Sequence, residues 1–231
     1  MKIYEYKVKI KLKQDLEYSQ LAEKTSYYID SILTEDNEFL SYHTGKQYKG
    51  YVHDLLYPIE NAGLYKKNKI YTMRIRMVED KLVQYLMAKL SFHETNEFEG
   101  VGGEIKIIQK RNIQRIYSIT PVILKNPGLG YWKGHMTLED FEKRLKDNLI
   151  KKYKFFTGKN IDESLSLYDL IEFKNKVPVK LPYKSINLLG DKIVLEIAQN
   201  EQAQELAYLA LGVGLLENNS RGFGFVNFKY M

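Results

Sequence analysis

Hydrophobic residues in the first half of the chain recur with the two periods that distinguish strands from helices. Apolar side chains at alternate positions over residues 3–12 and 70–78 predict half-buried strands. Apolar residues spaced three and four apart over 19–33 predict an amphipathic helix, and a second helix is expected over 79–91. Between the first helix and the strand that follows it, residues 34–47 are polar and rich in turn formers.

Two further strands complete this half. Residues 50–58 predict a strand that stops at Pro58, and residues 104–110 predict another after a glycine-rich turn at 100–103. The predicted order is therefore β-α-β-β-α-β, which is the order of a ferredoxin-like unit.

The second half has the same order in a looser form. Residues 155–175 carry little periodicity, and we interpret them as an insertion. The other elements are a strand over 113–124 that ends near Pro127-Gly128, a helix over 138–153 that Thr137 can cap, strands over 176–188 and 191–198, a helix over 201–211 that ends at Gly212, and a last strand over 223–229.

These patterns predict an α+β protein. We expect two tandem ferredoxin-like domains, which share the topology of RNA-recognition motifs, followed by a C-terminal glycine-rich loop. The first domain is predicted over residues 1–112 and the second over 113–231.

Positive charge is concentrated in the second half of the sequence. The formal net charge is +6, and residues 101–200 hold 18 Lys and Arg against 11 Asp and Glu. A surface of one sign attracts a polyanion such as RNA through the release of counterions, although a solvated lysine-rich face has the same composition. We predict a basic belt that binds the RNA backbone, formed by Lys106, Lys110, Arg111, Arg115, Lys133, Lys151 and Lys152.

The composition also limits the chemistry. The absence of Cys excludes disulfides, thiol nucleophiles and Cys-based zinc sites. The four His residues lack the H-E-x-x-H spacing, and neither a Walker loop nor a G-x-S-x-G elbow occurs, so we expect no metal and no cofactor. Without a signal peptide or an apolar run that could span a bilayer, a cytoplasmic protein with no membrane partner is expected.

The most distinctive segment is GVGLLENNSRGFG, between the last predicted helix and the last predicted strand. Glycines let backbone N–H groups approach a phosphate, and an arginine adds a charged fork, although a long connector capped by glycines would contain the same residues. The expected RNA contacts in this segment are Gly212, Gly214, Arg221, Gly222 and Gly224.

Residues 221–228, RGFGFVNF, also match the aromatic consensus of an RNA-recognition motif. In that motif this strand is the third of four, whereas here the chain stops three residues later. We therefore interpret the segment as a terminal strand, with Phe223 and Phe225 in the core. A protein that stacks bases on these two rings is kept as a third functional hypothesis.

A Gly-x-Gly pair, a polar stretch with a basic residue and Gly-Phe-Gly at the start of the final strand resemble the signature of repeat-associated RAMP proteins. The tandem ferredoxin-like halves strengthen this resemblance. Within that superfamily the chain is most similar to the CRISPR-associated endoribonuclease that cuts repeat RNA into guide units. The resemblance covers essentially the whole chain.

His43 is the candidate for proton transfer. It lies in SYHTGKQYKGYV, just after the first predicted helix, and Lys46 and Lys49 follow it. An imidazole moves protons near neutral pH, and RNA carries its own nucleophile in the 2′-OH group. Lys49 can stabilise the charge that develops on the phosphate, and Lys46 is expected to bind RNA.

The resemblance implies a catalytic set made of a Tyr on the first helix, a His after it and a Lys that enters the next strand. The matching residues are Tyr28, His43 and Lys49, and Tyr27 remains an alternative to Tyr28. The implied reaction is metal-independent attack of the 2′-OH, which gives 2′,3′-cyclic phosphate and 5′-OH ends.

The leading hypothesis is therefore an endoribonuclease that cleaves CRISPR repeat RNA. The second hypothesis is a non-catalytic RAMP subunit that binds RNA within a CRISPR ribonucleoprotein. Besides the repeat RNA, the partners to consider are other CRISPR effector subunits and a second copy of this chain in a homodimer.

Overall fold

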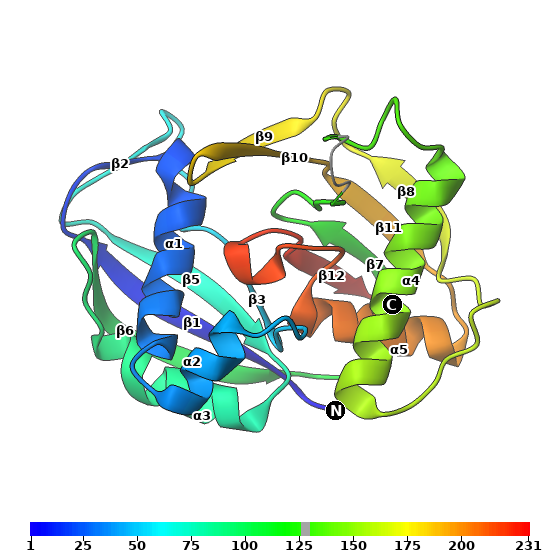
Figure 1. Cartoon of the computed structure of the whole chain (residues 1–231), viewed down its shortest axis with the longest axis horizontal. Coiled ribbons are helices and arrows are strands. Elements are labelled where there is room, and N and C mark those ends of the chain that lie inside the picture. The colour runs from blue at the N-terminus through cyan, green and yellow to red at the C-terminus, as the bar shows by residue number, and fades with distance from the viewer. Residues whose placement is uncertain (126–129) are drawn as a thin grey trace.

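The computed structural model describes residues 1–125 and 130–231, which form two four-stranded antiparallel sheets with their helices (Figure 1). The predicted α+β class with two ferredoxin-like units is confirmed. The strands of the first sheet end at Ile108 and those of the second begin at Ile113, while the domain boundary itself stays a prediction. The predicted strand end at Pro127-Gly128 lies outside the described residues.

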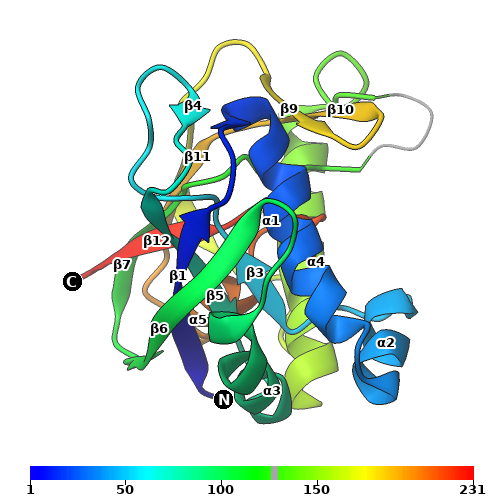
Figure 2. The same cartoon turned by 90° about the vertical axis from the view of Figure 1, so that its left-hand side faces the viewer.

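The first sheet has the strand order β3-β5-β1-β6, which is the ferredoxin-like order. The helices α1 and α3 lie on the same side of this sheet (Figure 2). The elements of this half are β1 (Ile3–Leu12), β2 (Leu16–Glu17), α1 (Tyr18–Leu33), α2 (Asn37–Thr44), β3 (Tyr51–His53), β4 (Leu64–Tyr65), β5 (Ile70–Met77), α3 (Asp80–Lys89), the short 3-10 helix η1 (Leu90–Phe92) and β6 (Phe98–Ile108).

The second sheet has the equivalent order β12-β7-β11-β8. A separate hairpin, β9–β10, crosses from this half to the end of α1, where the Lys184 N–H donates to Glu23 Oε2 at 3.0 Å (Figure 1). The elements of this half are β7 (Ile113–Ser118), α4 (Leu138–Thr157), β8 (Tyr168–Phe173), β9 (Val179–Tyr183), β10 (Ile186–Gly190), β11 (Ile193–Ile197), α5 (Glu201–Val213), the 3-10 helix η2 (Asn219–Arg221) and β12 (Val226–Tyr230).

Local sequence signals explain where the helices begin. In α1, Glu17 and Gln20 form a reciprocal capping box. In α4, Thr137 and Asp140 do the same, so the predicted cap is confirmed. The buried faces of these helices then pack on their sheets through apolar residues at helical spacing.

Several expected elements were wrong. The stretch 34–47 contains α2, because Asp36 caps a helix there by accepting bonds from Glu38 N and Phe39 N. The expected insertion at 155–175 contains the end of α4 and β8, and the single strand expected over 176–188 is instead the antiparallel hairpin of β9 and β10. The helix α2 and the strand β8 were not predicted because short, exposed elements have little hydrophobic periodicity.

The glycines expected to form a turn at 100–103 lie inside β6. A Cβ atom at Gly103 would lie 2.6 Å from the Tyr6 ring, and one at Gly100 would lie 2.6 Å from the Leu90 carbonyl oxygen. Glycine here allows the close approach of β1 and η1 rather than a reversal of the chain. The helix expected to end at Gly212 continues to Val213, and Gly214 caps it.

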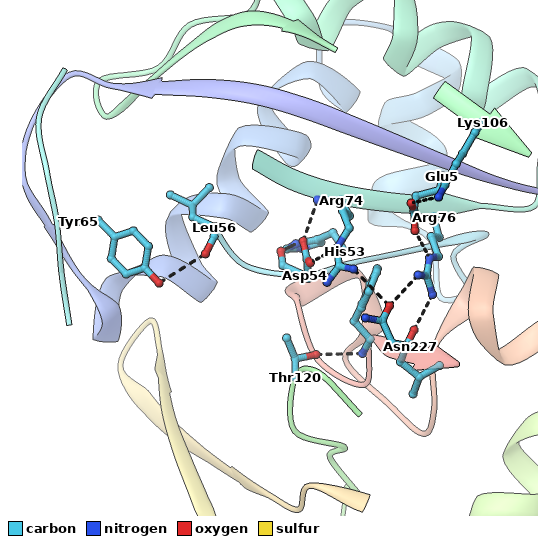
Figure 3. Close-up of polar contacts among 12 residues, drawn as sticks. Glu5, His53, Asp54, Leu56, Tyr65, Arg74, Arg76, Lys106, Thr120 and Asn227 are labelled. Carbon is cyan, nitrogen blue, oxygen red and sulfur yellow. Dashed lines mark hydrogen bonds and ion pairs between the residues drawn. The ribbon is translucent and has the colours of Figure 1, made fainter. Parts of the chain in front are cut away.

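Buried polar contacts join the two halves (Figure 3). The Arg76 guanidinium donates to Glu5 Oε2 at 2.8 Å on the first sheet, and to the Val226 carbonyl and Asn227 Oδ1 at 2.5 and 2.9 Å on β12. Burial acts to raise the pKa of Glu5, but Arg76 and Lys106 outweigh it and lower the pKa. The paired carboxylate and guanidinium therefore fix β12 against β5.

No helix in the described part of the chain, residues 1–125 and 130–231, has the length and apolar character needed to cross a bilayer.

Candidate active site

A cleft of about 450 Å³ opens between the two halves of the molecule. One wall comes from α1, α2 and the segment that follows α2, and the other comes from α4, the β9–β10 turn and the loop around η2. Figure 1 shows η2 between α1 and α4. The predicted residues that line the cleft are His43, Lys49, Lys152 and Arg221.

His43 is placed by α2, the helix that the sequence did not reveal. It lies in the last turn of this helix, and its side chain is 31% exposed. Its Nδ1 atom lies 3.2 Å from Asp30 Oδ1 on α1. The ring is thus held between two helices, with part of its surface open to the cleft.

Lys49 is held at the C-terminal end of the same helix. Its Nζ donates to the carbonyl oxygens of Tyr42 and Gly45, the second at 2.9 Å. A cation at this end of a helix is stabilised by the unpaired carbonyls and the helix dipole. Burial lowers the pKa of Lys49, whereas Asp30 and Glu79 act in the opposite direction.

Lys152 organises the glycine-rich loop from α4. The side chain is buried, and Nζ donates to the carbonyl oxygens of Gly214 and Leu216 at 3.0 and 2.7 Å and to Asn219 Oδ1 at 2.7 Å. Burial lowers the pKa of Lys152 to about 7. All three ammonium hydrogens thus have acceptors in the loop, so Lys152 supports the cleft wall from within.

The glycines of the loop shape its backbone. Gly212, Gly214, Gly222 and Gly224 are buried, and the expectation that they contact RNA stays a prediction. Gly224 has φ +67°, and a Cβ atom there would lie 2.2 Å from the Leu215 carbonyl oxygen. The loop presents the exposed side chain of Arg221 to the cleft.

The position of Tyr28 does not fit a catalytic role. Its ring is fully buried against Phe98, and its hydroxyl donates to the carbonyl oxygens of Leu90 and His93 at 2.7 and 3.1 Å. Burial raises the pKa of Tyr28. The alternative, Tyr27, is 55% exposed and lines a smaller cavity that shares Asp30 with the cleft.

Most of the predicted basic belt lies outside the cleft. Its cations pair with acids that are distant in sequence, in the contacts Lys106–Glu5 at 3.2 Å, Lys110–Glu205, Arg115–Glu196 at 2.7 Å and Lys133–Asp191 at 3.7 Å. Arg111 lies over the Tyr230 ring, whereas Lys46 and Lys151 are exposed. Four of the seven belt residues are therefore paired with acids, and a role of the belt in RNA binding stays a prediction.

Phe223 and Phe225 are fully buried, so they cannot serve as stacking platforms for bases. Phe225 lies beneath the guanidinium groups of Arg74 and Arg76, at 4.9 and 4.5 Å from the ring centroid. The interpretation of this segment as core is confirmed, and the third functional hypothesis loses its two aromatic residues.

The comparisons with known proteins identify the family. A family model described as "CRISPR associated protein Cas6, C-terminal" matches residues 104–228, which is more than half of the 231 residues. The chain belongs to the Cas6 family. It is 23% identical to "CRISPR-associated endoribonuclease Cas6 2" of Methanocaldococcus jannaschii, in an alignment covering 96% of this chain and 98% of that relative.

Solved structures of Cas6 and RAMP proteins share the fold. A structure of "CRISPR associated protein Cas6" superposes with a TM-score of 0.69 at 17% identity and covers 98% of this chain and 99% of the other. One described as "An RAMP protein binding different RNA substrates" gives a TM-score of 0.72 at 16% identity with the same coverage. The likeness therefore extends across both halves.

Further residues that line this cleft were not predicted as site residues from the sequence. They come from separate places in the chain, so no local motif marks them. They include Asp30 on α1, Tyr48 after α2, Lys125 after β7, Glu217 before η2, and Tyr183 and Lys184 on the β9–β10 hairpin. Within residues 1–125 and 130–231, no group of three or more His, Asp or Glu side chains is arranged to hold a metal ion.

Replacing Lys152 with Met should disrupt the glycine-rich loop of this Cas6 protein. The change leaves three buried oxygens without their donor, and at about 1 kcal/mol for each we expect a loss of about 3 kcal/mol of unfolding free energy. Urea denaturation measures this loss, and amide hydrogen exchange should locate it in the loop. Lys151→Met is the matched control, because Lys151 is the exposed neighbour on α4. Equal stability of the two variants would contradict this account of Lys152.

Proposed function

We propose that this protein is a metal-independent endoribonuclease that cleaves CRISPR repeat RNA, the precursor of guide RNA. The observation that carries the proposal is that His43 and Lys49, at the end of α2, and Arg221, in the distant loop around η2, line one cleft between the halves. An imidazole and two cations are the groups that RNA cleavage by its own 2′-OH requires.

In the proposed reaction, the 2′-OH oxygen attacks the adjacent phosphorus and the bond from phosphorus to the 5′ oxygen breaks. The proton of the 2′-OH leaves to a base, and a proton is delivered to the departing 5′ oxygen. His43 is suited to take the first proton and to return one, because imidazole titrates near neutral pH. The products are a 2′,3′-cyclic phosphate and a 5′-OH end.

The two cations would stabilise the charge that builds on the phosphate oxygens. Lys49 is held rigidly beside His43 by the end of α2, which favours a fixed electrostatic role. Arg221 is exposed and offers a planar fork for phosphate, with its guanidinium 5.3 Å from the centroid of the Tyr183 ring. Of the two adjacent tyrosines, Tyr27 is the one with an exposed side chain, in a neighbouring cavity that shares Asp30 with the cleft.

A second candidate function is supported by the burial of Tyr28. With this ring in the core, the catalytic set expected from the family resemblance is incomplete. The chain would then be a RAMP subunit that binds RNA within a CRISPR ribonucleoprotein and leaves it intact. The cleft and its cations would serve both functions, so cleavage assays must separate them.

His43→Ala should abolish cleavage and spare binding. With repeat RNA and a chelator present, we expect the wild type to give cyclic phosphate and 5′-OH ends, and the variant to cleave about 10²–10⁴ times more slowly. Denaturing gels and end-group analysis measure the products, and mobility shifts measure binding. RNA that is bound without being cut by the wild type would favour the second candidate. Full cleavage by His43→Ala would reject the assigned role of this residue.

The two adjacent tyrosines provide a matched pair. Tyr27→Phe removes an exposed hydroxyl and should lower the cleavage rate without changing stability. Tyr28→Phe removes a buried hydroxyl that donates to the Leu90 and His93 carbonyl oxygens, so it should lower the unfolding free energy by about 1 kcal/mol while folded molecules cleave normally. Single-turnover rates and urea denaturation test both variants. Slower cleavage by Tyr28→Phe with normal cleavage by Tyr27→Phe would instead support a catalytic role for Tyr28.

The salt dependence of RNA binding should distinguish the cleft from the belt. If Arg221 contacts one phosphate of a single strand, Arg221→Gln should reduce the slope of log K against log salt by about 0.7. Lys110→Gln should change the slope less, because Glu205 already neutralises that ammonium. Fluorescence anisotropy at several salt concentrations measures both. Equal reductions would extend the RNA path over the belt.

A further inference from the structure

Asp30 has no part in the sequence-based assignment, yet its carboxylate faces the candidate catalytic imidazole. It lies on α1 with 27% of its side chain exposed, and Oδ1 is 3.2 Å from His43 Nδ1 on α2. Burial raises the pKa of Asp30, while nearby basic groups act in the opposite direction. These groups are His43, Arg221, Lys184 and Lys49.

Two of the other basic groups around Asp30 are engaged elsewhere. Lys49 Nζ donates to two carbonyl oxygens at the end of α2, and the Arg221 guanidinium lies over the Tyr183 ring. The backbone of Lys184 is fixed to Glu23 in the β9–β10 turn. Among the described residues, His43 is the group that forms an ion-pair contact with the Asp30 carboxylate.

A carboxylate in this place is unfavourable for RNA binding alone. The cleft gathers Lys49, Lys125, Lys184 and Arg221, and its other carboxylate, Glu217, lies 3.6 Å from the Arg144 guanidinium. A negative charge at Asp30 repels the phosphate chain that the cations would attract. A surface that only held RNA would bind better without Asp30. Its presence beside the imidazole is explained if the carboxylate acts on that ring.

We propose that Asp30 is a positioning residue for His43. Its carboxylate holds the Nδ1 edge of the imidazole against α1 and keeps the hydrogen on Nδ1, so that Nε2 is free to accept the proton of the 2′-OH. This inference rests on the proposed function, because it assigns a role within the same reaction.

The physical basis is electrostatic. A carboxylate beside Nδ1 favours the tautomer with hydrogen on that nitrogen, and it stabilises the imidazolium formed when Nε2 takes a proton. The proton then passes from Nε2 to the departing 5′ oxygen, and the carboxylate remains ionised throughout. The imidazole thus accepts one proton from the 2′-OH and donates one to the 5′ oxygen, so it ends in its starting state. The same arrangement occurs in other sites where an acid orients a histidine.

Asp30→Asn in the full-length protein tests this role, because the amide keeps the shape and removes the charge. Single-turnover cleavage should fall by about 10-fold to 100-fold, less than for His43→Ala. The acidic limb of the pH–rate profile should move to lower pH, because the charge that favours the imidazolium is lost. RNA affinity should stay equal or increase, because a negative charge leaves the cleft.

A spectroscopic measurement on the RNA-free protein gives an independent readout. Nitrogen-15 NMR of labelled histidine reports which ring nitrogen of His43 carries the hydrogen. We expect Nδ1–H in the wild type and a shift toward Nε2–H in Asp30→Asn. Glu35→Gln is the matched control, since Glu35 is an exposed acid just beyond α1 and does not line the cleft.

The outcomes separate this inference from the proposed function. If the wild type does not cleave RNA, the proposed function fails, and the tautomer of His43 still decides the role of Asp30. An unchanged tautomer in Asp30→Asn overturns the inference. Full cleavage by Asp30→Asn with an unchanged pH profile also overturns the inference. So does a loss of cleavage in Asp30→Asn that is accounted for by weaker RNA binding or lower stability.

Discussion

The cleft depends on a buried ammonium group. Lys152 reaches from α4 into the loop that follows α5, and its three hydrogen bonds determine the path of the chain from Gly214 to Asn219. A lysine without such acceptors would be expelled from the interior, and a loop with three unpaired oxygens would not be stable there. The side chain that the cleft exposes, Arg221, follows directly from this buried anchor.

The two halves share their interior rather than touching at a surface. Phe223 packs in the core beneath the first sheet, while Ile3 of the opening strand packs in the core of the second half. The polar bonds of Arg76 to β12 fix the same junction (Figure 3). Because the candidate site takes His43 from one half and Arg221 from the other, this shared interior determines the distance between them.

The sequence alone predicted those features that depend on local hydrophobic pattern or on the chemistry of a single side chain. Periodicity predicted the long strands and helices, and His43, the residue proposed for proton transfer, does line the cleft. The sequence was less informative where contacts in the folded protein decide what a residue does.

The acids that pair with the belt residues are distant in sequence, and Lys106 and Glu5 are 101 positions apart. Tyr28 is buried and Tyr27 is exposed because of the orientation of α1 about its own axis. Lys152 was predicted to bind RNA, whereas its neighbours in space make it a structural residue.

The glycines that mark the family are packed inside the molecule, and they contribute backbone shape rather than reactive atoms. Natural selection on stability alone would therefore preserve them. A descendant could lose its imidazole, stop cutting nucleic acid and still retain every one of these glycines. Retention of these glycines therefore reports on the fold, whereas under the proposed function cleavage would depend on the imidazole at position 43, far from them in the sequence.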